Sequence, residues 1–454
     1  MPLRKRKKLT SFQIIILGFS GVILLGTLLL MLPVSSARRL PTSFADALFT
    51  ATSAVCVTGL VVRDTATYWS TFGQGVILLL IQIGGMGVIT VAASFAMISG
   101  RRISLMQRST MQEAISAPKV GGIVRLTGFI IRITLAIELL GAVVMMPVFC
   151  RDFGPRGIWM ALFHSVSAFC NAGFDLMGTR SPYSSLTSYA SQPVINVTIM
   201  VLIVVGGIGF LTWDDVKSNG VHLHKYRMQS KVILCTTAIL LLIPGVYFYF
   251  LEFKTLPTGE RLLASAFQAV TPRTAGFNTM DLTRLSEAGQ FITIALMLVG
   301  GSPGSTAGGM KTTTAAVLFA ASISTFRRKE DTHFFDRRID DDVVRNAATI
   351  LLMYLMLFFL GGLAISILEG LPMLTCLFET ASAVGTVGLT LGITPGLGGI
   401  SRGILIALMF FGRVGGLTLI FAALSGAKKN VSRLPKEKIR KLQVQVGHLL
   451  VEIL

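Results

Sequence analysis

The sequence predicts an all-α membrane protein of eight transmembrane helices in four parallel membrane–pore–membrane repeats around a central pore. Composition gives the class, because the 454 residues are 52% hydrophobic and 14% charged, against about 25% charged in soluble domains. Segment length gives the spans, because several nearly uncharged segments reach about 20 residues, enough to cross a hydrocarbon layer. Internal similarity gives the repeats, because four short glycine-tipped stretches resemble one another.

The predicted spans fall in pairs along the chain. The first is too long for a signal peptide and lacks a cleavage pattern, so we expect it to remain as a structural helix. The spans are 11–32, 72–99, 123–148, 194–212, 232–251, 291–324, 347–367 and 402–424. Pairing them predicts repeats at 1–115, 116–225, 226–335 and 336–427, followed by a cytoplasmic tail at 428–454.

Each pair of spans encloses a short helical pattern that leads into a glycine. The four stretches read LFTATSAVCVTGL, LFHSVSAFCNAGF, AFQAVTPRTAGF and LFETASAVGTVGL. Their glycines recur about every 110 residues, as expected of one unit used four times. The helical patterns, of about 10–14 residues, are too short to cross a membrane, so we expect re-entrant half-helices. Irregular backbone at that depth must line a watery cavity or be buried in protein.

The even number of crossings in each repeat and the distribution of charge give the predicted topology. Each repeat holds two crossings, so successive repeats enter with the same orientation and are related by an axis along the membrane normal. The net charge of +19 gathers in alternate connections, at 1–8, 101–108, 326–338 and 428–441. This positive-inside pattern places both termini in the cytoplasm and the half-helices on the outer side. It favours contact with anionic membrane lipids over binding of nucleic acid.

The four glycine strands are the first candidate site. Only the glycine is common to all four, whereas a site of side-chain ligands would need equivalent oxygens on each unit. Backbone carbonyls need only suitable dihedral angles, which glycine permits. A ring of carbonyls can replace the hydration shell of a monovalent cation, and the C-terminal ends of half-helices add partial negative charge. Glycines that merely allow close helix packing are the alternative.

The glycine strands supply the candidate filter residues. They are Cys56, Val57, Thr58, Gly59, Cys170, Asn171, Ala172, Gly173, Arg273, Thr274, Ala275, Gly276, Gly385, Thr386, Val387 and Gly388. The carbonyls expected to hold the ion belong to Val57, Thr58, Asn171, Ala172, Thr274, Ala275, Thr386 and Val387.

The motifs FTATSAVCVTGL, FHSVSAFCNAGF, FQAVTPRTAGFN and FETASAVGTVGLTLG resemble those of the Trk/Ktr/HKT superfamily of cation transporters. The resemblance covers nearly the whole chain and is greatest to the bacterial membrane subunit of Ktr/Trk potassium uptake systems. It implies potassium transport, a homodimer and a separate cytosolic nucleotide-binding ring of the RCK type that gates the path. Some plant relatives carry serine at the first filter glycine and favour sodium, so Gly59 points towards potassium. Sodium-selective or sodium-coupled transport, with Na⁺ as an activator, is the alternative.

The sixth span is a second candidate site. At 34 residues it would extend about 51 Å as one helix, which overshoots the bilayer. Its middle, GGSPGSTAGGMKTTT at 300–314, contains five glycines and a proline, which break helices. We expect a flexible loop that blocks or clears the path, and the resemblance implies such a gate; a passive kink is the alternative. The gate candidates are Gly300, Gly301, Ser302, Pro303, Gly304, Ser305, Thr306, Ala307, Gly308, Gly309, Lys311 and Arg413.

Several charges fall within apolar segments. Arg413 lies deep in the last span, where a charge usually faces a cavity or partner; snorkelling to the inner edge is the alternative. It could hydrogen-bond the carbonyls of the loop, and the resemblance implies an arginine at that point. Arg273 should point away from the axis towards an acid. Arg132 and Glu138 could pair, although a spacing of six does not place them on one helix face.

Polar residues on the half-helices and at one span end have more ordinary expected roles. Glu379 and His164 should anchor the glycine strands through hydrogen bonds rather than bind ions. Asp214 and Asp215 should cap or solvate the end of the fourth span.

The sequence argues against an enzyme. It has no HExxH or GxSxG motif, and its five cysteines form no CxxC or Cys/His pairing, so neither metal nor cofactor is expected beyond the transported ion. The stretch at 304–312 fails as a nucleotide-binding loop, because Met310 separates Gly309 from Lys311. A sensor or scaffold remains an alternative, although it would not require four matched glycines.

Overall fold

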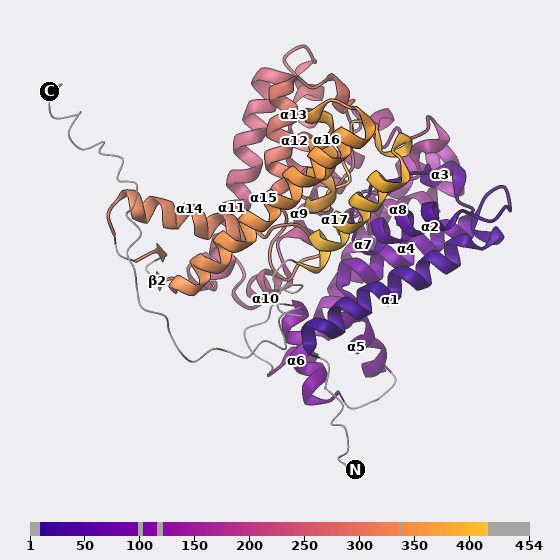
Figure 1. The fold of residues 1–454 in the computed structure, drawn as a ribbon. Coiled ribbons are helices and arrows are strands. Elements are labelled where there is room, and N and C mark those ends of the chain that lie inside the picture. The colour runs from indigo at the N-terminus through magenta and orange to yellow at the C-terminus, as the bar shows by residue number, and fades with distance from the viewer. Residues whose placement is uncertain (1–9, 99–102, 116–120, 330, 336, 416–454) are drawn as a thin grey trace.

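The computed structural model describes residues 10–98, 103–115, 121–329, 331–335 and 337–415. Within these ranges most residues are helical and very few form strands (Figure 1). The strands described are β1 (His333–Phe334) and β2 (Arg337–Arg338), an antiparallel pair with His333 opposite Arg338. The predicted tail at 428–454 lies outside the described residues.

The helices follow a pattern that repeats four times. Each run of this pattern is called a unit, and the units are numbered one to four along the chain. A long helix opens each unit: α1 (Ser11–Met31), α7 (Ile123–Phe153), α11 (Met228–Tyr247, continued by the π-helical turn η5, Phe248–Glu252) and α15 (Asp341–Glu369). A short helix follows: α2 (Phe44–Val55), α8 (Arg156–Phe169), α12 (Thr258–Val270) and α16 (Met373–Gly385). After a non-helical strand comes a further helix: α4 (Thr71–Met86), α9 (Pro193–Gly207), α13 (Glu287–Leu298) and α17 (Gly399–Val414).

Further helices and turns lie between these helices. They are α3 (Thr65–Tyr68), α5 (Val88–Ile98), α6 (Leu105–Ile115), α10 (Phe210–Asn219) and α14 (Thr312–Phe326), with 3₁₀ turns η1 (Pro33–Ser35), η2 (Met177–Thr179), η3 (Thr187–Tyr189), η4 (Leu223–Lys225), η6 (Leu282–Arg284) and η7 (Thr394–Gly396).

Three predicted spans are not straight helices. The segment 72–99 divides into α4 and α5, which meet at 97°, and the segment 194–212 ends in the 96° bend between α9 and α10. A glycine sits at each bend, Gly87 with φ of 86° and Gly209 with φ of 95°, a conformation that glycine adopts at little cost. The segment 291–324 is interrupted between α13 and α14 by residues 299–311, hereafter the internal loop.

Among the residues that the structure describes, length and composition mark four helices as able to cross a membrane: α1, α7, α15 and α11 with its π-helical turn. The number becomes six if each bent pair counts as one span. The predicted last span, 402–424, is described only to residue 415, and α17 ends at Val414. The eight-span arrangement therefore stays a prediction.

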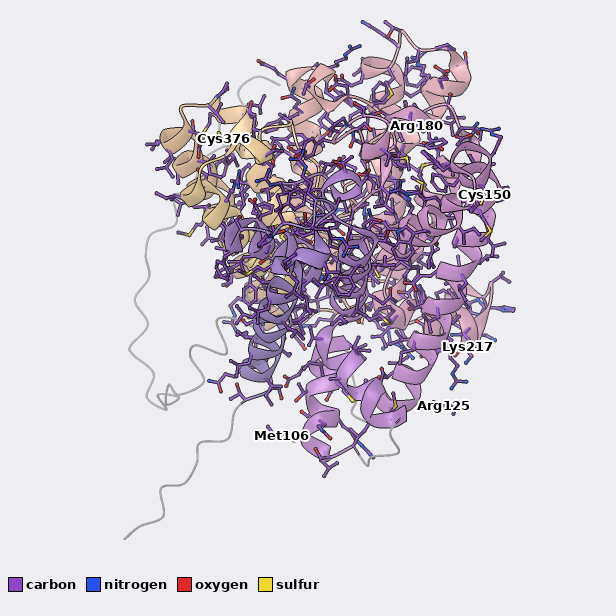
Figure 2. All side chains as sticks on the ribbon, turned by 90° about the vertical axis from the view of Figure 1, so that its right-hand side faces the viewer. Met106, Arg125, Cys150, Arg180, Lys217 and Cys376 are labelled. Atoms are coloured by element: carbon purple, nitrogen blue, oxygen red, sulfur yellow. The ribbon has the colours of Figure 1, made fainter. Side chains whose placement is uncertain are left out.

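The interior and the outer surface differ in the way expected of a membrane protein. Buried apolar side chains from all four units form one continuous core around the short helices. Large apolar side chains on the outer face of α15 remain exposed, among them Leu352, Leu360 and Ile367 at 62%, 58% and 74%. Exposure of such residues is expected where lipid, rather than water, surrounds a helix. Figure 2 shows Arg180, Cys150 and Cys376 towards one end of the molecule and Met106 and Arg125 at the other.

Candidate functional site

The four glycine strands meet in a closed ring. A Cβ added to Gly59 would stand 3.1 Å from Cα of Gly173, and one added to Gly173 would stand 3.0 Å from Cα of Gly276. A Cβ on Gly276 would lie 3.2 Å from Cα of Gly388, and one on Gly388 would lie 3.0 Å from Cα of Gly59. Segments far apart in the chain thus become cyclic neighbours. The space between them is too small for any side chain at these positions.

Backbone carbonyls crowd the same ring. A Cβ on Gly59 would meet the carbonyl oxygen of Ala172 at 2.6 Å, and one on Gly173 would meet that of Ala275 at 2.7 Å. The carbonyl oxygen of Thr58 stands in the same relation to Gly388. Each glycine is therefore overlaid by the carbonyl that precedes the glycine of a neighbouring strand.

All four glycine strands share an unusual backbone conformation. The ring glycines have φ between 69° and 94°. Two residues before each glycine stands a non-glycine residue that is also left-handed: Val57 (φ 50°), Asn171 (56°), Thr274 (61°) and Thr386 (53°). A left-handed residue with a side chain costs about 1–2 kcal/mol. The sequence does not predict this repeated strain, since the four residues share no type.

Hydroxyl groups at the ends of the short helices hold the glycine strands in place. Ser53 Oγ accepts a hydrogen bond from the Gly59 amide at 3.1 Å, and Ser382 Oγ accepts one from the Gly388 amide at 3.0 Å. In the second strand Ser167 Oγ donates to the Phe174 carbonyl at 2.7 Å. In the third, Thr271 donates to the carbonyl of Phe277. The only sequence signal for these anchors was a hydroxyl five or six residues before each glycine.

His164 and Glu379 also brace the backbone next to the strands. His164 Nε2 accepts from the Leu176 amide at 3.2 Å, and its Nδ1 lies 2.7 Å from the Met160 carbonyl. The carboxylate of Glu379 accepts from the Leu391 amide at 3.0 Å, from Thr394 Oγ1 at 2.6 Å and from Thr390 Oγ1 at 2.5 Å. Both side chains are fully buried and hold the segment that follows a glycine.

Two charged residues have partners other than those that the sequence suggested. Glu138, buried in α7, accepts a hydrogen bond from Gln82 Nε2 at 3.1 Å, and its Oε1 lies 3.7 Å from the Cys170 thiol. Arg132 is exposed and bonds to the Gly128 carbonyl, so the two do not pair. Arg273 is buried behind the third glycine strand, yet among the described residues no carboxylate lies within ion-pair distance of it. The expectation of an acid partner for Arg273 is therefore wrong within these residues.

Asp214 and Asp215 lie on α10, beyond the bend in the predicted fourth span. Asp214 pairs with Arg227 at 2.7 Å. Asp215 accepts from the Arg227 amide at 3.1 Å and from Ser230 Oγ at 2.6 Å. Together they join α10 to the start of α11.

The internal loop lies against helices of the other units, on the side of the glycine strands where α4, α9 and α17 end. The Ser302 amide donates to the Gly207 carbonyl at 3.0 Å, and the Gly309 amide donates to the Gly412 carbonyl at 3.1 Å. Thr306 Oγ1 bonds to Asn171 Oδ1 at 2.9 Å. The loop is thereby tied to units two and four and to a glycine strand itself.

Two half-buried cations accompany the internal loop. The guanidinium of Arg413 donates to the carbonyls of Thr306 in the loop and of Gly84 and Gly85 at the end of α4. Lys311 Nζ donates to the Ala307 carbonyl at 2.9 Å. Both side chains line a cavity of about 320 Å³. Arg413 therefore links three units at the level of the loop.

Known proteins resemble this chain over most of its length. Residues 3–432 match the model of the TrkH family, described as cation transport protein. The chain is 40% identical to the potassium/sodium uptake protein NtpJ of Enterococcus hirae, over 97% of this chain and 99% of that protein. It is 39% identical to the Ktr system potassium uptake protein B of Bacillus subtilis, over 95% and 98%. The crystal structure of the potassium transporter TrkH from Vibrio parahaemolyticus matches with a TM-score of 0.72 at 20% identity, covering 92% of this chain and 86% of that one.

Proposed function

The chain belongs to the TrkH family of cation transport proteins, and on that premise we propose that it takes up potassium across the bacterial cell membrane as the ion-conducting subunit of a Ktr/Trk-type system. It is a transport protein rather than an enzyme. Relatives of 39% and 35% identity, from Bacillus subtilis and Vibrio alginolyticus, are named as Ktr system potassium uptake proteins. The transported K⁺ is the substrate, and no cofactor is proposed.

The closed ring of glycine strands is the observation that carries this proposal. In an ordinary extended strand, successive carbonyls point to opposite sides. Left-handed residues at alternate positions, such as Val57 and Gly59, turn successive carbonyls towards the same side. Four such strands around one axis would offer stacked carbonyl rings in place of water around a monovalent cation. The ion would bind the carbonyls of Val57, Thr58, Asn171, Ala172, Thr274, Ala275, Thr386 and Val387.

We propose that the ring of glycine strands is the selectivity filter. It would lie at the centre of four membrane–pore–membrane repeats with eight crossings, divided near residues 115, 225 and 335 and ending near 427. Both termini then face the cytoplasm, and the short helices enter from outside. The bent pairs α4–α5 and α9–α10 cross once each, and the internal loop interrupts the second crossing of the third repeat.

The internal loop is proposed as the gate. Hydrogen bonds from Thr306, Ser302 and Gly309 hold it to the second and fourth units. The positive charges of Arg413 and Lys311 beside it oppose a passing cation. Opening requires the loop to leave the Arg413 guanidinium. Gating by a separate cytosolic nucleotide-binding ring, and a homodimeric assembly, belong to the same proposal.

Sodium-selective or sodium-coupled transport is the second candidate. The observation that favours it is the name of a 40% identical relative, a potassium/sodium uptake protein. Both candidates use the same path, and they differ in the ion that the carbonyl rings hold or in a second ion that activates the path.

Flux through the purified protein tests the proposal. The full chain is reconstituted into liposomes, and uptake of K⁺ and of Na⁺ is followed separately under equal gradients. We expect K⁺ uptake well above that of empty liposomes and above Na⁺ uptake. Na⁺ uptake exceeding that of K⁺, or K⁺ uptake that requires Na⁺, supports the second candidate. Liposomes that admit neither ion, with the protein inserted and folded, contradict both.

A further inference from the structure

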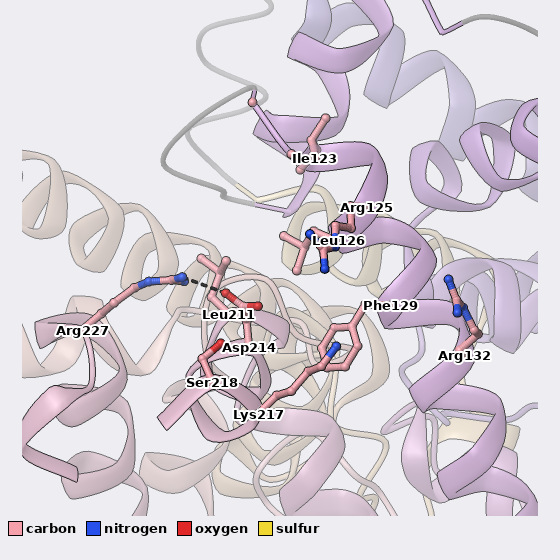
Figure 3. Close-up of a pocket in the computed structure, with 12 residues that line it drawn as sticks. Ile123, Arg125, Leu126, Phe129, Arg132, Leu211, Asp214, Lys217, Ser218 and Arg227 are labelled. Carbon is pink, nitrogen blue, oxygen red and sulfur yellow. Dashed lines mark hydrogen bonds and ion pairs between the residues drawn. The ribbon is translucent and has the colours of Figure 1, made fainter. Parts of the chain in front are cut away.

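We infer that the pocket between α7 and α10 binds the phosphate-bearing headgroup of an anionic phospholipid. The pocket has a volume of about 900 Å³, and Figure 3 shows the residues that line it. It lies at the start of α7, whereas the glycine strand of that unit follows the opposite end of the helix. None of the residues that line the pocket belongs to a glycine strand or to the internal loop. The inference requires only that the chain sits in a membrane.

The lining of the pocket is strongly basic. Arg125 and Arg132 come from α7, Lys217 comes from α10 and Arg227 precedes α11. The lining holds one carboxylate, Asp214, which is bound by Arg227 at 2.7 Å. Figure 3 shows this pair on one side of the pocket and the α7 cations facing it. An anion that enters the pocket therefore meets a net positive surface.

Three of these cations have no carboxylate partner. Across the described ranges, Arg125, Arg132 and Lys217 form no ion pair within 4 Å. Arg132 Nε bonds only to the Gly128 carbonyl of its own helix, at 3.2 Å. Lys217 Nζ stands 4.4 Å from the centre of the Phe129 ring, a contact that leaves its N–H donors free to bind an anion. Their charges are thus available to a ligand.

Spacing along α7 places the cations on one helix face. Arg125, Phe129 and Arg132 are separated by four and three residues, the spacing of neighbours on a helix surface. The two arginines are about 10 Å apart along the axis. The first turn of α7 adds donors, because Gly122 precedes it with φ of 80° and supplies no side-chain cap. This geometry suits a phosphate with a polar group attached.

The same face of α7 continues into an apolar surface, which favours a lipid over a free anion. Leu135 and Leu139 follow Arg132 by three and seven residues and are 48% and 58% exposed. A phospholipid would use both parts of this stripe, with its phosphate among the cations and its acyl chains along the leucines. Inorganic phosphate would use only the cations. A stripe that changes from basic to apolar within one turn is what a lipid molecule at the membrane surface requires.

Lipid binding to the purified full chain tests the inference. Binding of phosphatidylglycerol and of phosphatidylcholine is measured by native mass spectrometry, for the wild type and for the R125Q/R132Q/K217Q variant. The matched control is R327Q/R328Q/K329Q, which removes three exposed cations outside the pocket. We expect the pocket variant to lose phosphatidylglycerol affinity by about tenfold or more, with phosphatidylcholine binding unchanged. The control variant should stay within about twofold of the wild type.

Further arms separate the lipid from other anions and guard against misfolding. Inorganic phosphate at the same concentration should not displace phosphatidylglycerol. Displacement would show that the pocket binds free phosphate rather than a lipid. The single variant K217Q should bind phosphatidylglycerol more weakly while its thermal midpoint without lipid matches the wild type. Equal loss of affinity in the pocket and control variants would show a general charge effect and overturn the site. Normal lipid binding by the pocket variant, even with lost docking of a regulatory protein, would overturn it as well.

Discussion

Replacing Arg413 by glutamine should release the internal loop. The Arg413 side chain donates hydrogen bonds both to the Thr306 carbonyl in the loop and to the carbonyls of Gly84 and Gly85 in α4. A hydrogen bond to a charged group contributes about 1.5–3 kcal/mol, and 1.4 kcal/mol corresponds to a factor of ten. Loss of the bond to Thr306 should therefore raise the fraction of molecules with a displaced loop by about 10- to 100-fold.

The assay is K⁺ uptake into liposomes that contain the chain alone, without any regulatory subunit. Uptake by R413Q should exceed that of the wild type at equal protein density. Lys311→Gln is the matched control, because Lys311 bonds only to carbonyls of its own loop and does not tie that loop to α4. Its effect should be smaller. R413K keeps the charge without the fork of donors, so it separates electrostatic repulsion from the tether. Unchanged or lower uptake by correctly folded R413Q would refute the reasoning.

Three further predictions concern the glycine strands and the loop beyond them. Gly59→Ala or Gly388→Ala should abolish selective K⁺ uptake, because a Cβ has no room and φ is 94° at both; retained K⁺ over Na⁺ preference in flux would contradict this. Ser53→Ala and Ser382→Ala each remove a hydrogen bond of about 1 kcal/mol to a ring amide, so the ratio of K⁺ to Na⁺ uptake should fall several-fold while thermal stability changes little; a preserved ratio would show that these hydroxyls do not position the strands. Burial raises the pKa of Asp175, outside the spanning helices, to about 7. The folded state then binds more protons than the unfolded state between about pH 4 and pH 7, so this group makes unfolding easier as pH rises across that range, and Asp175→Asn should flatten that slope in thermal melts.

The repeated stretches were predictable because each carries its own local signal. A short apolar helix, a hydroxyl and a glycine recur in every unit, and the structure forms the short helices α2, α8, α12 and α16 there. The break at 299–311 was predictable for the same reason, since glycines and a proline leave no helical alternative. Such features depend on the chain within about one turn.

The bends at Gly87 and Gly209 were missed because glycines also occur within straight membrane helices. At Gly209 a tertiary contact holds the bend, because Phe210 donates its amide to the Gly304 carbonyl of the internal loop at 2.7 Å. The hydrogen bond between Glu138 and Gln82 could not be predicted from the sequence either, because Gln82 lies in another unit. The left-handed residues in the glycine strands, Val57, Asn171, Thr274 and Thr386, share no residue type that would have predicted this conformation.

Locating a heavy alkali ion bound to the protein tests the central claim most directly. Crystals of the full chain soaked in Rb⁺, an analogue of K⁺, would give an anomalous map. The account predicts peaks on the axis of the four glycine strands, within coordination distance of the carbonyls of Thr58, Ala172, Ala275 and Val387. Carbonyls turned away from that axis, or Rb⁺ bound only elsewhere, would contradict it.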